Sequence, residues 1–174
     1  VVGLANNHIM DHGSAGLEST IDALQRSGIR YIGAGRNLRE ASEISIHNIR
    51  GLRVGVLAMA DHEFGIASVC VPGANPLSSI DFVRQMRLHR ADVDYLVVLL
   101  HAGKEYYSYP SPALQNMCRF FVEEGANAVL CQHSHCPGCC ERYRGGHIVD
   151  GQGKFLFDRY PKKRGNWNRG FLVK

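Results

Sequence analysis

The chain has 174 residues, of which 45% are hydrophobic and 21% charged, and its formal net charge is +4 at pH 7. This length suits one domain with a sizeable core, spanning residues 1–174, and the composition excludes a disordered chain. No apolar run approaches the roughly 20 residues of a membrane-spanning helix. The one dense basic cluster, Lys162–Arg164 with Arg169, is too short for a nucleic-acid-binding stripe, so we expect no nucleic-acid partner.

Strand and helix signals alternate along the chain. Leu17, Ile21 and Leu24 recur at helical spacing after the candidate cap Ser14, and Gly28 marks a stop. In chain order we expect a strand at 1–5, helix 14–28, strand 30–32, helix 37–43, a hairpin of 44–49 and 52–57, loop 61–76, helix 79–89, strand 94–100, helix 111–124, and strands 126–130, 140–143, 147–149 and 154–157. This order predicts an α/β fold in which a second sheet packs against the first. Because a domain rarely begins within a core strand, we also expect sequence upstream of Val1.

Polar side chains follow three of the predicted strands. Asn6-Asn7-His8 comes after the first strand, His101 after the strand at 94–100, and His133-Ser134-His135 after the strand at 126–130. In α/β folds such positions build the functional site. Histidines delivered together from separate strand ends are a natural site for zinc, iron or manganese. The sequence therefore predicts a metal site at one edge of the sheet.

The segment Leu4–Gly13, LANNHIMDHG, resembles a signature of the CapA-type proteins of poly-γ-glutamate capsule synthesis. The likeness continues through His101–Tyr106, Gln132–His135 and Gly153–Asp158, in the order that the family has them. It covers nearly the whole chain. The family is in turn similar to the calcineurin-like metallophosphatases, so the resemblance implies a four-layer α/β/β/α sandwich of two sheets flanked by helices, here incomplete at the N-terminus.

The resemblance also implies a site that holds two divalent metal ions, of manganese, zinc, iron or magnesium. Carried over by motif, Asn7 and His101 would ligate one metal together with His133, and His135 would ligate the other. His8 would contact the phosphate and act as general acid, and Asp11 would orient His8 or hold the loop. Two metals can clamp the attacking and leaving oxygens of a phosphoryl group.

Two departures from the family pattern affect these expectations. The superfamily's Asp-x-His and Asp segments have no counterpart in the chain, so we expect about half of a two-metal site, weak metal binding and little or no phosphoesterase activity. Lys154 stands where the family has asparagine. It could bind an anionic substrate or repel a metal, and a lysine that simply faces solvent at a strand end is an equal alternative.

Six cysteines are present, and four of them, at positions 131, 136, 139 and 140, flank the His-x-His segment. A zinc knuckle at Cys136 and Cys139, a disulfide from Cys136 to Cys139 or Cys140, and free loop thiols are the three interpretations. A structural zinc site usually takes ligands from two separated pairs, and one pair is convincing here, so free thiols are favoured.

Two functions follow from the resemblance. The first is hydrolysis of phosphoester-type bonds by a metallophosphatase-like domain in capsule production. The alternative is a non-enzymatic subunit that handles polymer or acts as a scaffold. Either would work beside membrane-bound synthase subunits, on an anionic polymer or a phosphorylated small molecule, as an extracytoplasmic, membrane-anchored protein of the cell envelope.

Overall fold

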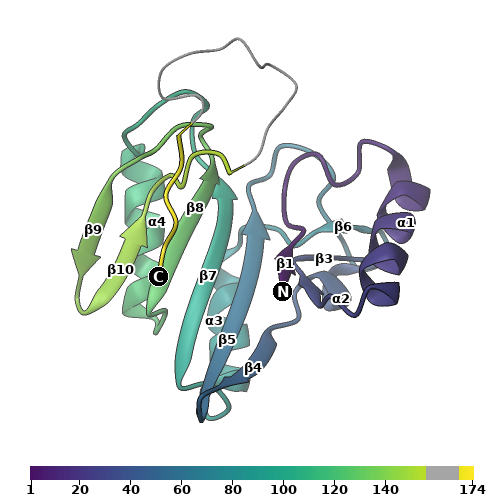
Figure 1. Ribbon diagram of the computed structural model, residues 1–174, viewed down its shortest axis with the longest axis horizontal. Helices are drawn as coiled ribbons and strands as arrows, with labels where there is room; N and C mark the ends of the chain where they lie inside the picture. The colour runs from purple at the N-terminus through teal and green to yellow at the C-terminus, as the bar shows by residue number, and fades with distance from the viewer. Residues whose placement is uncertain (156–168) are drawn as a thin grey trace. The chain divides into compact units, whose positions relative to one another are not determined.

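A computed structural model describes residues 1–155 and 169–174 of the chain. The chain forms two compact units, Val1–His101 and Ala102–Lys174. Strands and helices alternate in both units (Figure 1). The α/β class predicted from the sequence is therefore confirmed.

The first unit opens with a β–α–β segment. Strand β1 (Val2–Gly3) pairs in parallel with β2 (Tyr31–Ile32), and helix α1 (Gly13–Arg26) connects them. Leu17 and Ile21 lie one turn apart on α1 and pack with Leu4 and Ala34. Leu17 and Ile21 form the apolar face of α1, and their burial holds the helix against the short strands.

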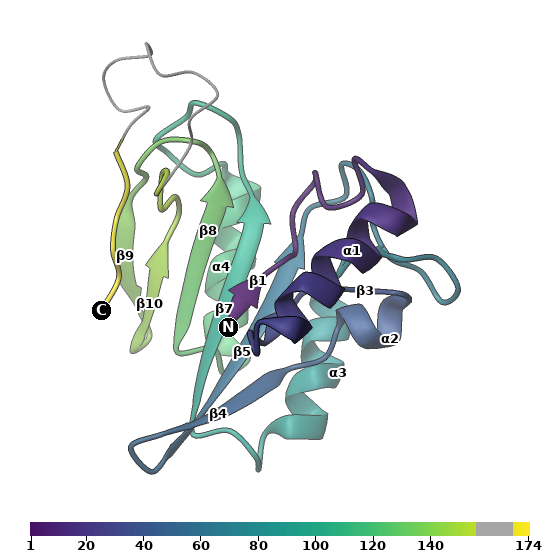
Figure 2. The same cartoon turned by 45° about the vertical axis from the view of Figure 1, so that its right-hand side comes forward.

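A second β–α–β segment follows. Strands β4 (Ser45–Ile49) and β5 (Leu52–Ala60) form an antiparallel hairpin, which is seen in Figure 2. Helix α3 (Ser79–His89) then leads to β7 (Tyr95–Ala102), which pairs in parallel with β5. The side chain of Ser78 caps α3 by accepting a hydrogen bond from the backbone N–H of Asp81. The parallel register brings Ala60 level with His101, at the carboxyl ends of both strands.

Small residues allow close packing in the rest of the first unit. Strand β3 (Ala34–Gly35) pairs with β6 (Gly73–Ala74), and the four-residue helix α2 (Leu38–Ala41) follows β3. Gly33 has a φ of +83°, and a Cβ placed on it would lie 2.7 Å from Cβ of Ala58 and 2.8 Å from Cβ of Ala5. Only glycine adopts this positive φ easily and also leaves room for the two neighbouring alanines.

In the described part of the second unit, a helix packs on three neighbouring strands. Strand β10 (Gly146–Val149) lies between β8 (Ala128–His133), its parallel neighbour, and β9 (Cys140–Tyr143), its antiparallel neighbour. Helix α4 (Pro112–Glu123) covers β8 and β10 (Figure 1). It begins at the cap Ser111 and buries four side chains against the sheet, those of Leu114, Cys118, Phe121 and Val122.

Several predicted elements differ from the observed ones. The first strand is only two residues long and exposed, and α1 begins at Gly13, with His12 rather than Ser14 at the cap. The short strands β3 and β6 lie where the sequence indicated a break and a loop. Of the strand expected at 154–157, residues 154 and 155 are not in a strand, and residues 156 and 157 lie outside the described residues, as does the basic cluster Lys162–Arg164. In the described ranges, none of the helices has both the length and the apolarity to cross a bilayer.

Candidate functional site

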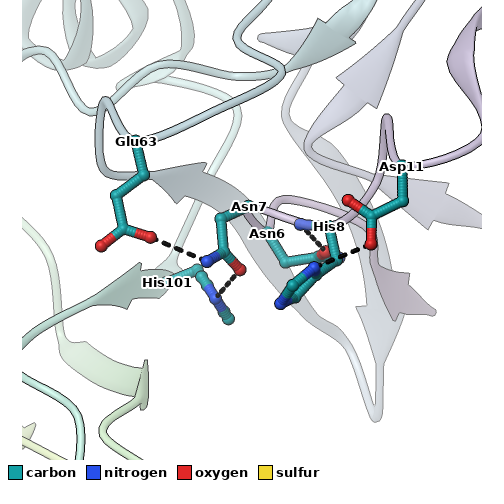
Figure 3. Close-up of polar contacts among 6 residues, drawn as sticks. All are labelled: Asn6, Asn7, His8, Asp11, Glu63 and His101. Atoms are coloured by element: carbon teal, nitrogen blue, oxygen red, sulfur yellow. Dashed lines mark hydrogen bonds and ion pairs between the residues drawn. The ribbon is translucent and has the colours of Figure 1, made fainter.

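A tight turn follows β1 and carries the first group of polar side chains (Figure 3). The side-chain amide of Asn6 donates to the carbonyl of Leu4 at 3.0 Å, and its oxygen accepts the backbone N–H of His8 at 2.9 Å. The backbone N–H of Asp11 then donates to the carbonyl of His8 at 3.1 Å. These bonds fix the backbone from Leu4 to Asp11, so the side chains that it carries have defined positions.

Asn7 is the buried centre of this group. Its Nδ2 donates to Oε2 of Glu63 at 2.7 Å, and its Oδ1 lies 3.1 Å from Nε2 of His101. An ionised carboxylate only accepts hydrogen bonds, so Glu63 determines which end of the Asn7 amide faces it. The amide oxygen is therefore presented to the His101 ring, as Figure 3 shows.

His8 and Asp11 form an exposed pair on the same turn. Nδ1 of His8 lies 2.9 Å from Oδ2 of Asp11, and both side chains are more than half exposed. The carboxylate fixes the proton on Nδ1 and leaves Nε2, on the opposite side of the ring, as the nitrogen that can meet another molecule. The structure thus brings His8 and Asp11 together.

The second unit carries the His-x-His segment on a strained backbone. His133 ends β8 with a φ of +93°, and His135 has a φ of +58°. Tyr106, at a φ of +61°, donates its backbone N–H to the carbonyl of Ser134 and stacks its ring on that of His135, with centroids 5.8 Å apart. Positive φ is uncommon for residues other than glycine and concentrates at functional sites. The ring centroids of His133 and His135 are 6.1 Å apart.

The surroundings of His135 favour its neutral form. Burial lowers its pKa below the usual value, and the positive charge of Lys154 lowers it further, against the opposing effect of Glu105, whose Oε1 lies 3.5 Å from Nε2 of His135. The Nζ atom of Lys154 is itself buried. The interpretation of Lys154 as a solvent-facing lysine is therefore wrong, and its charge acts beside the His-x-His segment.

These donors suit a divalent cation. The 3.1 Å between Oδ1 of Asn7 and Nε2 of His101 is close to the separation of two ligand atoms at right angles on an ion with bonds of about 2.1 Å. A neutral imidazole is the form that binds metal, and the low pKa of His135 favours it. Asn7 with His101 in the first unit, and His133 with His135 in the second, thus form two donor groups.

Glu63 is the residue that sequence reasoning missed. It lies three positions after the end of β5, in a segment that the sequence indicated only as a loop. The rule that found His101 and His133, namely that polar residues after a strand end build the site, also applies here. Had β5 been extended to Ala60, Glu63 would have been a candidate.

The fold and the strand-end polar groups define a class of α/β protein with candidate metal-binding loops. The chain matches the family model described as "Bacterial capsule synthesis protein PGA_cap" over residues 1–159, and it belongs to this family. Capsule biosynthesis protein CapA of Bacillus anthracis is 31% identical over 91% of the chain and 40% of its own length. PGA biosynthesis protein CapA of Bacillus subtilis is 28% identical over 91% of the chain and 43% of its own length. The chain thus spans less than half the length of these relatives.

A solved structure shows the same fold. It is the crystal structure of a putative 5′-nucleotidase from Staphylococcus aureus in complex with α-ketoglutarate. The alignment covers 87% of the present chain and 31% of the nucleotidase chain, with a TM-score of 0.58 and 18% sequence identity. At this identity the likeness concerns the fold alone. It confirms the fold class that the sequence predicted.

Proposed function

We propose that the chain is part of a metal-dependent hydrolase of phosphoester-type bonds that acts in capsule or poly-γ-glutamate production. The observation that carries the proposal is the arrangement of Asn7, in which Glu63 holds the amide so that its oxygen faces Nε2 of His101. Outer partners that fix the orientation of a ligand are a regular part of metal sites.

The chain's own donors would hold the metal. Asn7 and His101 form one donor group and His133 and His135 the other, and their sharing of metal ions, as the family resemblance implies, stays a prediction. A bound divalent ion supplies an activated water and neutralises charge on a phosphoryl oxygen. Lys154 places a buried positive charge beside His135, which favours an anionic substrate.

His8 has the geometry of a proton donor. Oδ2 of Asp11 lies 2.9 Å from Nδ1 of His8, so the opposite nitrogen, Nε2, is the one that would give its proton to a leaving oxygen. Both side chains are exposed, and a substrate can therefore reach the ring from solvent. In this proposal Asp11 is a positioning residue, since it acts on the substrate only through His8.

The names of the relatives support the setting of this activity. Two of them are called capsule or PGA biosynthesis proteins, and one from Mycobacterium tuberculosis is called a probable polyglutamine synthesis accessory protein. We propose that this chain likewise works with membrane-bound polymer synthase subunits at the cell envelope, in a protein anchored outside the cytoplasm.

The test compares wild-type protein, at its natural length, with two variants. Manganese-supplemented protein is assayed on a chromogenic phosphomonoester and phosphodiester, beside His8→Asn and the control His89→Asn, whose histidine pairs with Asp92 on the surface. We expect turnover by the wild type, a fall of about 10²–10⁴-fold in kcat for His8→Asn, and no change in the control.

Equal rates for the wild type and His8→Asn would contradict the hydrolytic proposal. If the protein also retained bound metal and bound poly-γ-glutamate, the non-enzymatic polymer-handling function would be favoured instead. Circular dichroism of each variant separates an effect on chemistry from a loss of fold.

A further inference from the structure

Three side chains of metal-ligand type meet inside the second unit, apart from the histidines described above. They are Cys118 on α4, Cys131 on β8 and Asp150, which follows β10. All three are buried, and their ligand atoms lie within 4.8 Å of one another. The two sulfur atoms are 3.5 Å apart.

The fold brings these residues together from three elements. Strands β8 and β10 are parallel with Leu130 opposite Val149, so the next residues, Cys131 within β8 and Asp150 just after β10, lie beside each other. Helix α4 covers both strands, and Cys118 lies on its buried face, one turn after Leu114. The three side chains therefore lie in the layer between helix and sheet, where burial is complete.

Asp150 is out of place in an apolar layer. It is 5% exposed, and its Oδ1 is buried without a hydrogen-bond partner among the described residues. The nearby guanidinium of Arg119 is engaged with Glu141, at 2.6 Å and 3.0 Å. Burial raises the pKa of Asp150 to about 6. A buried carboxyl oxygen without a partner is costly and requires a physical explanation.

We propose that Cys118, Cys131 and Asp150 bind a thiophilic divalent cation, with zinc preferred. Two thiolates and one carboxylate are ligands that zinc takes, with bonds of about 2.3 Å to sulfur and 2.0–2.2 Å to oxygen. In a tetrahedron these bonds place the ligand atoms roughly 3.5–3.8 Å apart, which the observed sulfur separation of 3.5 Å approaches. Binding releases the two thiol protons.

The carboxylate distinguishes this site from a disulfide. Oxidation of Cys118 and Cys131 would join the two sulfur atoms but would leave Asp150 buried without a partner. A cation accounts for all three groups, because it supplies the charge that the carboxylate lacks. The three side chains leave a fourth tetrahedral position for water or another donor, and the ion would tie α4 to the ends of β8 and β10.

Cobalt substitution tests the site. Chelator-treated, reduced protein is titrated with Co²⁺, whose thiolate complexes give charge-transfer absorption in the near ultraviolet and intense visible bands when tetrahedral. We expect the signal to saturate at one cobalt per chain and to disappear on addition of zinc. The nitrogen and oxygen donors of the candidate hydrolytic site produce no thiolate band, so the two sites are distinguished.

Variants assign the signal to its ligands. Cys118→Ser/Cys131→Ser should abolish the band, and the isosteric Asp150→Asn should weaken cobalt binding about tenfold or more. Cys70→Ser and Cys140→Ser, at two exposed cysteines, should leave the band unchanged, as should Asn7→Ala/His101→Ala. If the double serine variant fails to fold, Asp150→Asn makes the assignment, together with a zinc-dependent rise in Tm that the wild type shows and this variant lacks.

Three results would overturn the proposal. The first is folded, reduced wild-type protein that gives no thiolate band at saturating cobalt. The second is a band that persists unchanged in both Asp150→Asn and the double serine variant. The third is a Cys118–Cys131 disulfide, mapped by mass spectrometry in zinc-free protein purified without reductant.

Discussion

Oδ1 of Asn7 lies 3.1 Å from Nε2 of His101, although 94 positions of sequence separate the two residues. Asn7 follows β1 and His101 lies near the end of β7, so the relationship depends on two strand ends of the first unit. The amide of Asn7 is oriented by Glu63 on a third segment. An asparagine oxygen and an imidazole nitrogen held in this way form the core of the proposed metal site.

Loss of Glu63 should weaken metal binding without removing a proposed ligand. In Glu63→Ala the Asn7 amide loses the acceptor that fixes its orientation, and Mn²⁺ affinity should fall about 10–100-fold. Glu63→Gln retains a carbonyl acceptor, so its loss should be smaller. The measurement is a manganese titration by calorimetry, with Glu18→Ala on the exposed face of α1 as the control. Wild-type affinity in Glu63→Ala would contradict the role given to Glu63.

His8 and Asp11 should affect turnover rather than metal content. His8→Asn removes the proposed proton donor, whereas Asp11→Asn removes only the carboxylate that holds Nδ1 of His8. We expect kcat to fall further in His8→Asn than in Asp11→Asn, because only His8→Asn removes the group that gives the proton. Bound metal, measured by elemental mass spectrometry, should match the wild type in both. A loss of metal in His8→Asn would show that His8 is a ligand.

Gly33 should be far less tolerant of a side chain than Gly51. Both have positive φ, +83° and +87°, so alanine suffers a similar backbone cost of roughly 1–2 kcal/mol at each. At Gly33 the new Cβ would also overlap the Cβ atoms of Ala5 and Ala58, whereas at Gly51 it meets open space. Overpacking should cost Gly33→Ala a further 1–3 kcal/mol or so, measured by urea denaturation. Equal losses in the two variants would contradict the close packing described here.

The ion pair of Arg53 and Asp94 should make stability depend on acid pH. The Arg53 guanidinium lowers the pKa of Asp94 from 3.8 to about 2 in the folded state. Because the pKa is lower in the folded than in the unfolded chain, the pair stabilises above pH 3.8, and this contribution is lost as the pH falls toward 2. Asp94→Asn should therefore show a smaller drop in Tm over this window than the wild type. Asp22→Asn, at an exposed position on α1, should keep the wild-type drop.

The elements that the sequence predicted well carry their own local signals. Helix α3 spans Ser79–His89 as expected, because Ser78 caps it and its apolar spacing is regular. The β4–β5 hairpin was predicted from two alternating runs around Arg50-Gly51, where both residues have positive φ. By contrast, β3 pairs with β6 through small residues that are far apart in the sequence, and a local sequence pattern does not predict such a pairing.

The candidate site likewise contains residues that the sequence predicts and residues that it does not. The strand-end rule predicts Asn7, His101 and His133 as candidates, because each comes just after a predicted strand. It does not reach Glu63, because the alternating pattern predicts a strand that ends at Leu57, three residues before the observed end of β5 at Ala60. The strained backbone of His135 and the burial of the Lys154 ammonium depend on packing around them, and no spacing in the sequence encodes either.

The most direct test of the central claim measures manganese binding by Asn7→Ala/His101→Ala. The free ion is quantified by electron paramagnetic resonance. Manganese prefers oxygen and nitrogen donors, so the thiolate variant Cys118→Ser/Cys131→Ser serves as the matched control. We predict that the wild type and the thiolate variant bind manganese alike and that Asn7→Ala/His101→Ala loses this binding while remaining folded. Unchanged manganese binding in that variant would contradict the claim that Asn7 and His101 hold the metal.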